Sequence, residues 1–345
     1  MIESSLPQSE PVLLPGRPFG RQVRSVAGYS LLMTLMIVTG IPVFVPAALL
    51  HCAIRNGKRA AWAVLVVVLL VVSLYGASVP ATAPDAQKMA WSYLGAVVLA
   101  LALPTMASVP LVERGEKFGR VLTFMLVGSM IGFALTEITA QRFLAFSPYA
   151  SFVADAKLTA AQLLTAARAS GAQAEAVRTN EQVFAWALQV VPGMLLMHVS
   201  VLFILSLLMV GRLNAWRPLT DRGNVTEALG NYRFRNFALP DWFLFAFILG
   251  GLTPLASGML QKVAANTLTV VAFLYILQGL AIFRFLLVAM GAGFAGTMLG
   301  WLLLVLLTFT GVGPLLLGLA GLFDPFFDFR HFKKRKDDSH ESHSD

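Results

Sequence analysis

Polar side chains occur inside long apolar runs of this sequence, and such groups bind ligands or carry protons when they face a cavity. His198 lies near the middle of the apolar run 183–211, and an imidazole titrates near neutral pH. Glu137 lies near the end of the run 119–139. We expect His198 to be a ligand or proton site and Glu137 to contact a ligand or a cation. The alternatives are a histidine that donates to neighbouring backbone and a glutamate that reaches water at a helix end.

The run 265–288 contains more polar groups than the other runs. Thr267 and Gln278 are about three helical turns apart, so a helix places them on one face. Asn266 and Arg284 are five turns apart and share another face. We expect Asn266, Thr267 and Gln278 to line a polar substrate site, or else to hydrogen-bond neighbouring helices. Arg284 is expected at the cytoplasmic end, in contact with lipid phosphate or an acidic partner.

Two small-residue motifs predict close helix packing. They are Gly128-x-x-x-Gly132 and Gly296-x-x-x-Gly300, a spacing that lets helix backbones approach in membranes. Packing within the chain is the favoured interpretation.

Charged residues close the last apolar stretch. Asp324, Asp328 and Arg330 predict either an ion pair at the membrane interface or a contact with a cytosolic partner.

The sequence contains none of the common catalytic or metal-binding motifs. It has no Walker-type loop, no His-Glu-x-x-His and no Gly-x-Ser-x-Gly, and its single cysteine, Cys52, excludes an internal disulfide. We therefore predict no catalytic residue, no metal and no cofactor, and we expect that the protein is not an enzyme. A lipid-acting membrane enzyme that uses His198 is the remaining alternative.

The composition indicates which elements position these residues. Hydrophobic residues make up 57% of the 345 residues and charged residues 13%, whereas soluble domains contain about 45–50% and about 25%. The surplus of apolar residues predicts an all-α polytopic membrane protein in contact with the lipid bilayer. The net charge of +8 reflects Lys and Arg in cytoplasmic loops, and no nucleic-acid partner is expected.

About eight to ten hydrophobic segments follow from the apolar runs, since about 20 helical residues cross a bilayer core. The runs are 60–77, 89–112, 119–139, 183–211, 241–258 and 265–288. Two further stretches, 28–54 and 293–323, are interrupted by Gly and Pro. Each is either a kinked span or a short hairpin.

The distribution of Lys and Arg favours a multi-pass protein of the inner (cytoplasmic) membrane with both termini in the cytoplasm. The expected segments are a tail at 1–27, membrane helices at 28–139, an external loop at 140–182, membrane helices at 183–329 and a disordered tail at 330–345. The external loop holds a short amphipathic helix from Thr159, a capping position, to Ser170-Gly171. A cytoplasmic loop at 212–240 is expected to lie on the membrane surface with Trp216, Tyr232 and Phe237 at the interface.

Five segments near the C-terminus resemble a family. They are 237–242 (FALPDW), 265–269 (ANTLT), 274–279 (LYILQG), 319–324 (LAGLFD) and 327–330 (FDFR). Together they resemble the YybS-like family of predicted membrane proteins. That family is distantly similar to the substrate-binding (S) components of energy-coupling-factor transporters.

The resemblance implies a helical membrane domain that captures a small molecule. It also implies docking on a transmembrane coupling subunit with cytosolic ATPases. By their position in the matching segments, the implied functional residues are Asn266, Tyr275, Gln278, Gly279, Asp324, Asp328 and Arg330. We expect small-molecule transport or substrate capture from the outer side. The alternative is a structural or assembly partner of other envelope proteins without transport activity.

Overall fold

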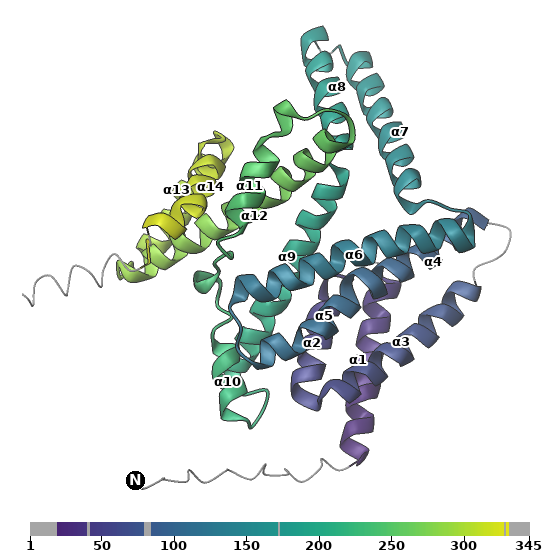
Figure 1. The fold of residues 1–345 in the computed structure, drawn as a ribbon, viewed down its shortest axis with the longest axis vertical. Coiled ribbons are helices and arrows are strands. Elements are labelled where there is room, and N and C mark those ends of the chain that lie inside the picture. The colour runs from purple at the N-terminus through teal and green to yellow at the C-terminus, as the bar shows by residue number, and fades with distance from the viewer. Residues whose placement is uncertain (1–18, 40–41, 79–83, 172, 328, 331–345) are drawn as a thin grey trace, which may run out of the picture.

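The fold is helical throughout the residues that the computed structural model describes, which are 19–39, 42–78, 84–171, 173–327 and 329–330 (Figure 1). In chain order the elements of the first half are α1 (Phe19–Val38), η1 (Pro42–Phe44), α2 (Val45–Asn56), α3 (Lys58–Ser78), α4 (Pro84–Ala96), η2 (Val97–Ala102), α5 (Leu103–Glu113), α6 (Phe118–Leu144) and α7 (Pro148–Ala169). Those of the second half are α8 (Ala174–Gln189), α9 (Val191–Trp216), α10 (Gly223–Gly230), η3 (Phe234–Asn236), α11 (Phe243–Gly251), η4 (Thr253–Leu255), α12 (Gly258–Ala289), α13 (Phe294–Phe309) and α14 (Val312–Phe327).

Four helices in this part of the chain are long and apolar enough to cross a membrane. They are Asp85–Glu113, Phe118–Leu144, Val191–Trp216 and Gly258–Ala289. The first is the continuous helix formed by α4, the π-helical η2 and α5. The predicted all-α polytopic membrane fold is therefore confirmed.

The long helix α9 joins two groups of helices. It contacts α2 and α6 of the N-terminal group and α12 of the C-terminal group. In the C-terminal group, α14 and α11 both pack against α12, and α13 folds back on α14 (Figure 1). At 26 residues, α9 is about 39 Å long, which exceeds the thickness of a bilayer core.

The predicted span at 241–258 is wrong. It contains the nine-residue α11, which is only about 13 Å long, and then the short turn η4. The glycines and proline at 250–254 end the helix, so the chain reverses before it has crossed. By contrast, α12 is longer than the run 265–288 because it begins at Gly258.

Both interrupted stretches divide where the glycines and prolines lie. The stretch 28–54 becomes α1, which begins at Phe19 within the predicted tail, and the short buried helix α2. The stretch 293–323 becomes α13 and α14, which meet at an angle of 109° beside Gly311. At 16 residues each, α13 and α14 are about 24 Å long and form a bent pair.

The predicted external loop is a helical hairpin, made of α7 and α8, and not a loop with one short helix. Helix α7 starts at Pro148, because Ser147 supplies the N-cap, and Thr159 lies within it. It ends at the predicted Ser170-Gly171. The run 183–211 is also divided, because α8 ends at Gln189 and α9 begins before Pro192.

The segment 212–240 places two of its three predicted interfacial aromatic residues in the protein core, while its arginines Arg212, Arg217 and Arg222 stay exposed. Tyr232 and Phe237 are buried, whereas Trp216 is 79% exposed. The ring of Phe118 on α6 packs against both buried aromatic rings. The Tyr232 hydroxyl donates to the Glu116 carbonyl at 3.0 Å, and burial raises the pKa of this phenol. For Tyr232 and Phe237, contacts with residues distant in the sequence thus decide burial, although the surrounding sequence is basic.

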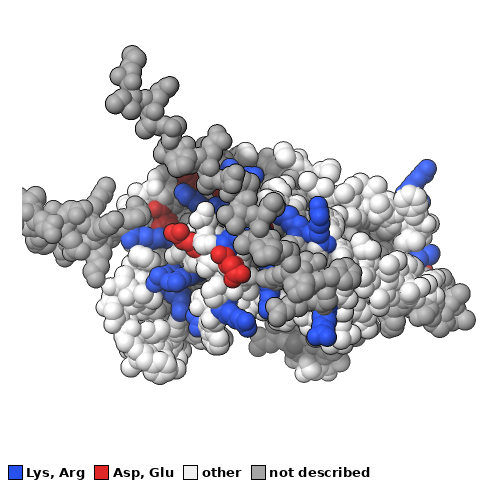
Figure 2. Space-filling model, turned by 90° about the horizontal axis from the view of Figure 1, so that it is seen from below, with Lys and Arg blue, Asp and Glu red and all other residues white. Residues whose placement is uncertain are grey.

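Basic side chains gather on one face of the molecule. Figure 2 shows Lys and Arg residues on the face where α10 lies. The Lys58–Glu113 ion pair at 3.1 Å joins the basic α2–α3 turn to the end of α5, and Arg120 pairs with Glu116 at the start of α6. Residues 1–18 of the predicted tail 1–27, residue Asp328 and residues 331–345 of the predicted tail 330–345 lie outside the described residues.

Candidate functional site

An apolar chamber of about 1090 Å³ lies between α4, α6, α7, α8 and α9. Its walls are mainly aliphatic and aromatic, and the charged side chains that line it are Glu137 and Asp155. Ligand pockets typically have volumes of about 300–1,000 Å³ and a mostly apolar lining with a few polar groups. The chamber is slightly larger than this range, has the same mostly apolar lining, and is partly open, because lining residues such as Phe152 and Leu163 are exposed.

The helical hairpin α7–α8 forms one wall of the chamber. Helix α6 ends where Ala145 adopts a left-handed conformation with φ 47°. The chain then turns at Ser147, whose hydroxyl accepts from the Ala150 amide at 3.0 Å, and Pro148 begins α7. An ion pair between Arg168 and Glu181 joins the two helices of the hairpin. This turn directs α7 away from α6 and leaves space between them.

Glu137 is the one sequence-predicted binding residue that lines the chamber. Its carboxylate accepts from the Ser147 hydroxyl, from the Gln141 amide at 2.7 Å and from the Tyr149 backbone amide at 3.1 Å. A carboxylate at a helix N-terminus stabilises the helix. Glu137 therefore holds the start of α7 in place, and its oxygens are already hydrogen-bonded within the protein.

The opposite wall depends on close packing of α6 against the π-helical segment η2. A Cβ atom added at Gly132 would overlap the backbone of Leu99, and one at Gly128 would lie 3.0 Å from the Pro104 ring. Gly128 and Gly132 thus allow α6 to pack closely on its neighbour, as the Gly128-x-x-x-Gly132 motif predicts. Gly296 and Gly300 differ, because added Cβ atoms there would meet only side chains at 3.0 Å or more.

Asn266 ties α12 to the junction between α8 and α9. Its side-chain oxygen accepts from the Gly193 amide at 2.6 Å, and its nitrogen donates to the Gln189 carbonyl at 3.0 Å. Pro192 interrupts the helix at this junction and leaves backbone groups unpaired. The amide of Asn266 supplies their partners. Thr267 is half-buried, and its hydroxyl makes no hydrogen bond with a described residue.

His198 and Arg284 are both exposed, on α9 and near the end of α12. Replacing His198 with Ala is expected to leave the free energy of unfolding unchanged or to raise it, because the exposed imidazole of this membrane-spanning helix faces the bilayer, where a polar group is costly. Thermal unfolding in nanodiscs measures this change. A hydrolytic or transferase activity on lipid that disappears in His198→Ala would contradict a passive role for this residue.

A buried polar network joins the C-terminal helices to the segment before α11. The Gln278 side chain accepts from the Leu239 amide at 2.9 Å and donates to Asp324 at 3.1 Å. The Asp324 carboxylate lies 3.5 Å from the guanidinium of Arg330. Gln278 and Asp324 thus bond to each other and lie outside the chamber lining.

Arg330 completes this network on the backbone of the segment before α11. Its guanidinium donates to the carbonyls of Phe237 at 2.6 Å and Arg235 at 3.1 Å. Non-helical backbone inside a membrane protein is tolerated where other protein groups satisfy it. The network of Gln278, Asp324 and Arg330 therefore stabilises the non-helical chain between η3 and α11.

Tyr275 and Gly279 lie where α12 and α14 cross. The Tyr275 ring packs edge-on against Phe247 of α11, with centroids 5.7 Å apart. A Cβ atom at Gly279 would overlap the Leu317 carbonyl, and one at Gly321 would overlap the Tyr275 carbonyl. The crossing thus brings the two helix backbones into direct contact, and both residues have packing roles.

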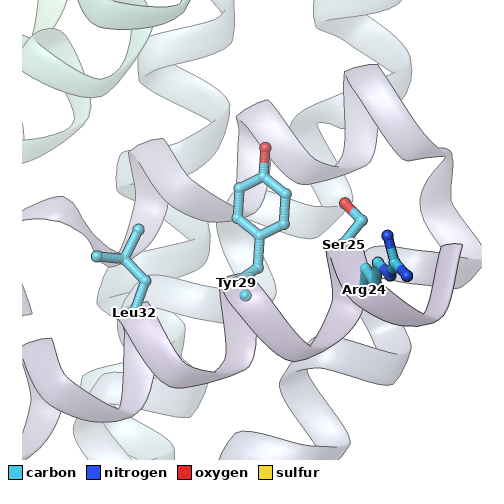
Figure 3. Close-up of a pocket in the computed structure, with 5 residues that line it drawn as sticks. Arg24, Ser25, Tyr29 and Leu32 are labelled. Atoms are coloured by element: carbon cyan, nitrogen blue, oxygen red, sulfur yellow. The ribbon is translucent and has the colours of Figure 1, made fainter. Parts of the chain in front are cut away.

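A second, shallower hollow of about 230 Å³ lies on α1 (Figure 3). Arg24, Ser25, Gly28, Tyr29 and Leu32 line it, and the Tyr29 hydroxyl is hydrogen-bonded to His51 of α2. Since one helix supplies all of its lining, the hollow offers little enclosure for a ligand.

Asp155 is a chamber residue that the sequence interpretation missed. It lies on α7 between Phe152 and Thr159, at helical spacings that put all three on the chamber side. A carboxylate inside an apolar stripe with a period of about 3.6 residues is the signal that identifies it. The stripe can be recognised only if the helix starts at Pro148, because the predicted helix begins at Thr159 and leaves Asp155 outside.

Metal binding has no support in the described part of the chain, where no group of three or more His, Cys, Asp or Glu side chains is arranged to hold an ion.

Comparison with known proteins identifies one family. Searches of curated proteins and of solved structures find no match to this chain. A family model for a predicted membrane protein, DUF2232, matches residues 28–325, which cover α2 to α13 entirely and most of α1 and α14. The chain therefore belongs to the DUF2232 family of predicted membrane proteins.

Proposed function

We propose that this membrane protein captures a small apolar or amphipathic molecule in the chamber and takes part in its transport. The chamber carries this proposal, because its volume and apolar lining suit such a ligand. The polar substrate site expected from His198, Asn266, Thr267, Tyr275 and Gln278 has no such support, since these residues line no part of the chamber.

The proposal includes an orientation. The first residues of helix α9 lie in the chamber wall, and its other end carries Arg212 and is followed by Arg217 and Arg222. Lys and Arg accumulate on the cytoplasmic side of membrane proteins. We accordingly place the basic face of Figure 2 in the cytoplasm of a cell with this protein in its inner membrane, and the chamber on the outer side.

The proposal is tested by a substitution that fills the chamber with a large side chain and by a labelled probe that reports whether the chamber still binds. The probe is hexadecanol with a photoactivatable diazirine on its chain, added to the protein in phosphatidylcholine nanodiscs. Mass spectrometry measures labelling of chamber peptides relative to α13, whose side chains are mostly exposed. Ala156 of α7 lines the chamber, and Ala156→Trp is expected to lower this ratio about fivefold or more, a loss of about 1 kcal/mol of binding.

Ala154→Trp is the matched control. Ala154 is exposed on the same helix and does not line the chamber, so the same substitution leaves the chamber open. Equal labelling ratios in the wild type, Ala156→Trp and Ala154→Trp would contradict the proposal.

The C-terminal segments resemble the YybS-like family, which is distantly similar to S components, and this resemblance extends the proposal to partners. It suggests delivery of the captured molecule to a transmembrane coupling subunit with cytosolic ATPases. The chemical test is crosslinking in native membranes from a photoreactive residue placed at Arg222, an exposed position beside α10 on the basic face. Recovery of ATPases with a membrane subunit supports this extension.

A second candidate function is assembly with other envelope proteins, and the α7–α8 hairpin favours it. Among its described residues only Ala160 of α7 and Val177 of α8 are fully buried and most of the others are exposed, so the hairpin offers a large surface to a partner. Crosslinking from Arg178, an exposed residue of α8, tests this function. A stoichiometric envelope partner, together with unchanged hexadecanol labelling in Ala156→Trp, would favour assembly over capture.

A further inference from the structure

We infer that the chamber prefers amphiphiles with a cationic head group over anionic ones, and that Asp155 contacts that head group. This inference rests on the proposed function, because it names the class of molecule that the same chamber takes. Three features of the chamber support it: the sign of its charged groups, the hydrogen bonding of its two carboxylates and its aromatic content.

The charge of the lining has one sign. Glu137 and Asp155 are its charged residues, and no Lys, Arg or His side chain is among those that line it. An anionic head group would therefore be repelled by two carboxylates and would find no counter-charge. A cationic head group would gain one.

The two carboxylates differ in their partners. Glu137 accepts three hydrogen bonds at the start of α7, from the Ser147 hydroxyl and from the amides of Gln141 and Tyr149. The Asp155 carboxylate has no hydrogen bond or ion pair with a described residue. Asp155 is also exposed, so its carboxylate is accessible to a bound molecule. Asp155 is thus the carboxylate that can pair with a bound cation.

Aromatic rings in the same chamber add to this preference. They belong to Tyr93, Phe133, Phe146, Tyr149, Phe152 and Phe184. The face of an aromatic ring attracts a cation, and sites that bind alkylammonium groups combine such rings with apolar surface. The remaining lining is aliphatic and suits a hydrocarbon chain.

Three diazirine-bearing probes with the same hexadecyl chain test the inference: the alcohol, the primary amine and the sulfate. Labelling of chamber peptides relative to α13 is measured in phosphatidylcholine nanodiscs at neutral pH. The wild type is expected to show a ratio about two- to fivefold higher for the amine than for the sulfate, the range of partly exposed ion pairs. Asp155→Asn is expected to lower the amine to the level of the alcohol and to leave the alcohol unchanged.

Glu175→Gln is the matched control, because Glu175 is an exposed acid of the same hairpin that does not line the chamber. It should retain the preference for the amine. Equal chamber ratios for the three probes in the wild type, with labelling still lost in Ala156→Trp, would overturn this inference and leave the proposed function intact. An amine preference that survives Asp155→Asn would overturn the assignment of Asp155. Labelling that is insensitive to Ala156→Trp would instead reject the proposed function.

Discussion

Asp324→Ala is expected to lower the free energy of unfolding by about 3–5 kcal/mol, the cost of leaving a buried charge without its partner. The Asp324 and Arg330 side chains are only 10% and 16% exposed, and their charged atoms lie 3.5 Å apart. The substitution also removes the acceptor of the Gln278 amide. Chemical denaturation in bicelles, followed by circular dichroism, measures the change.

Two variants separate the buried charge from other causes. Asp324→Asn keeps the shape of the side chain and an oxygen that can accept from the Gln278 amide, and it removes only the charge, so the part of the loss that it reproduces is due to the buried charge of Arg330. Glu181→Ala removes the exposed ion pair with Arg168 and is expected to cost at most about 1 kcal/mol. A loss in Asp324→Ala no greater than that in Glu181→Ala would show that the network contributes little.

Gly279→Ala is expected to separate α14 from α12. The new methyl group would overlap the Leu317 carbonyl, which belongs to the backbone of α14, so the two helices must move apart to make room for it. Overpacking costs about 1–3 kcal/mol when side chains yield, so we expect about 3 kcal/mol or more here. Hydrogen exchange of the α14 amides should accelerate in this variant, because α14 makes most of its contacts with α12.

Gly318→Ala is the control on α14. An added Cβ atom there lies 3.5 Å from the Ile276 side chain, which is ordinary contact. Both variants introduce the same methyl group into a helix, so only the neighbouring atoms differ. Slow exchange of the α14 amides in both variants would contradict the close crossing.

Substitutions in the C-terminal helices and substitutions in the chamber are expected to have different effects. Asp324 and Gly279 lie in the C-terminal helices, while Ala156 and Asp155 lie on the α7–α8 hairpin. Substitutions of the first kind are expected to lower stability, and those of the second to change labelling with little effect on stability.

The sequence by itself predicts the membrane class, the all-helical fold and many of the helix ends. Hydropathy is a local property that decides which segments enter lipid, and Gly and Pro act within one or two turns. The break beside Gly311 and the end of α7 at Ser170 therefore follow from the local sequence. The sequence also identifies the family of predicted membrane proteins whose model matches residues 28–325.

Only the tertiary structure decides the partners of the polar residues. Gln278 and Asn266 both lie on α12, but one bonds to Leu239 and the other to Gly193 and Gln189. The chamber likewise exists because the turn at Ser147 directs α7 away from α6. Periodicity gives the face of a helix on which a side chain lies. The segment that meets that face is set by long-range packing, which no local pattern of residues encodes.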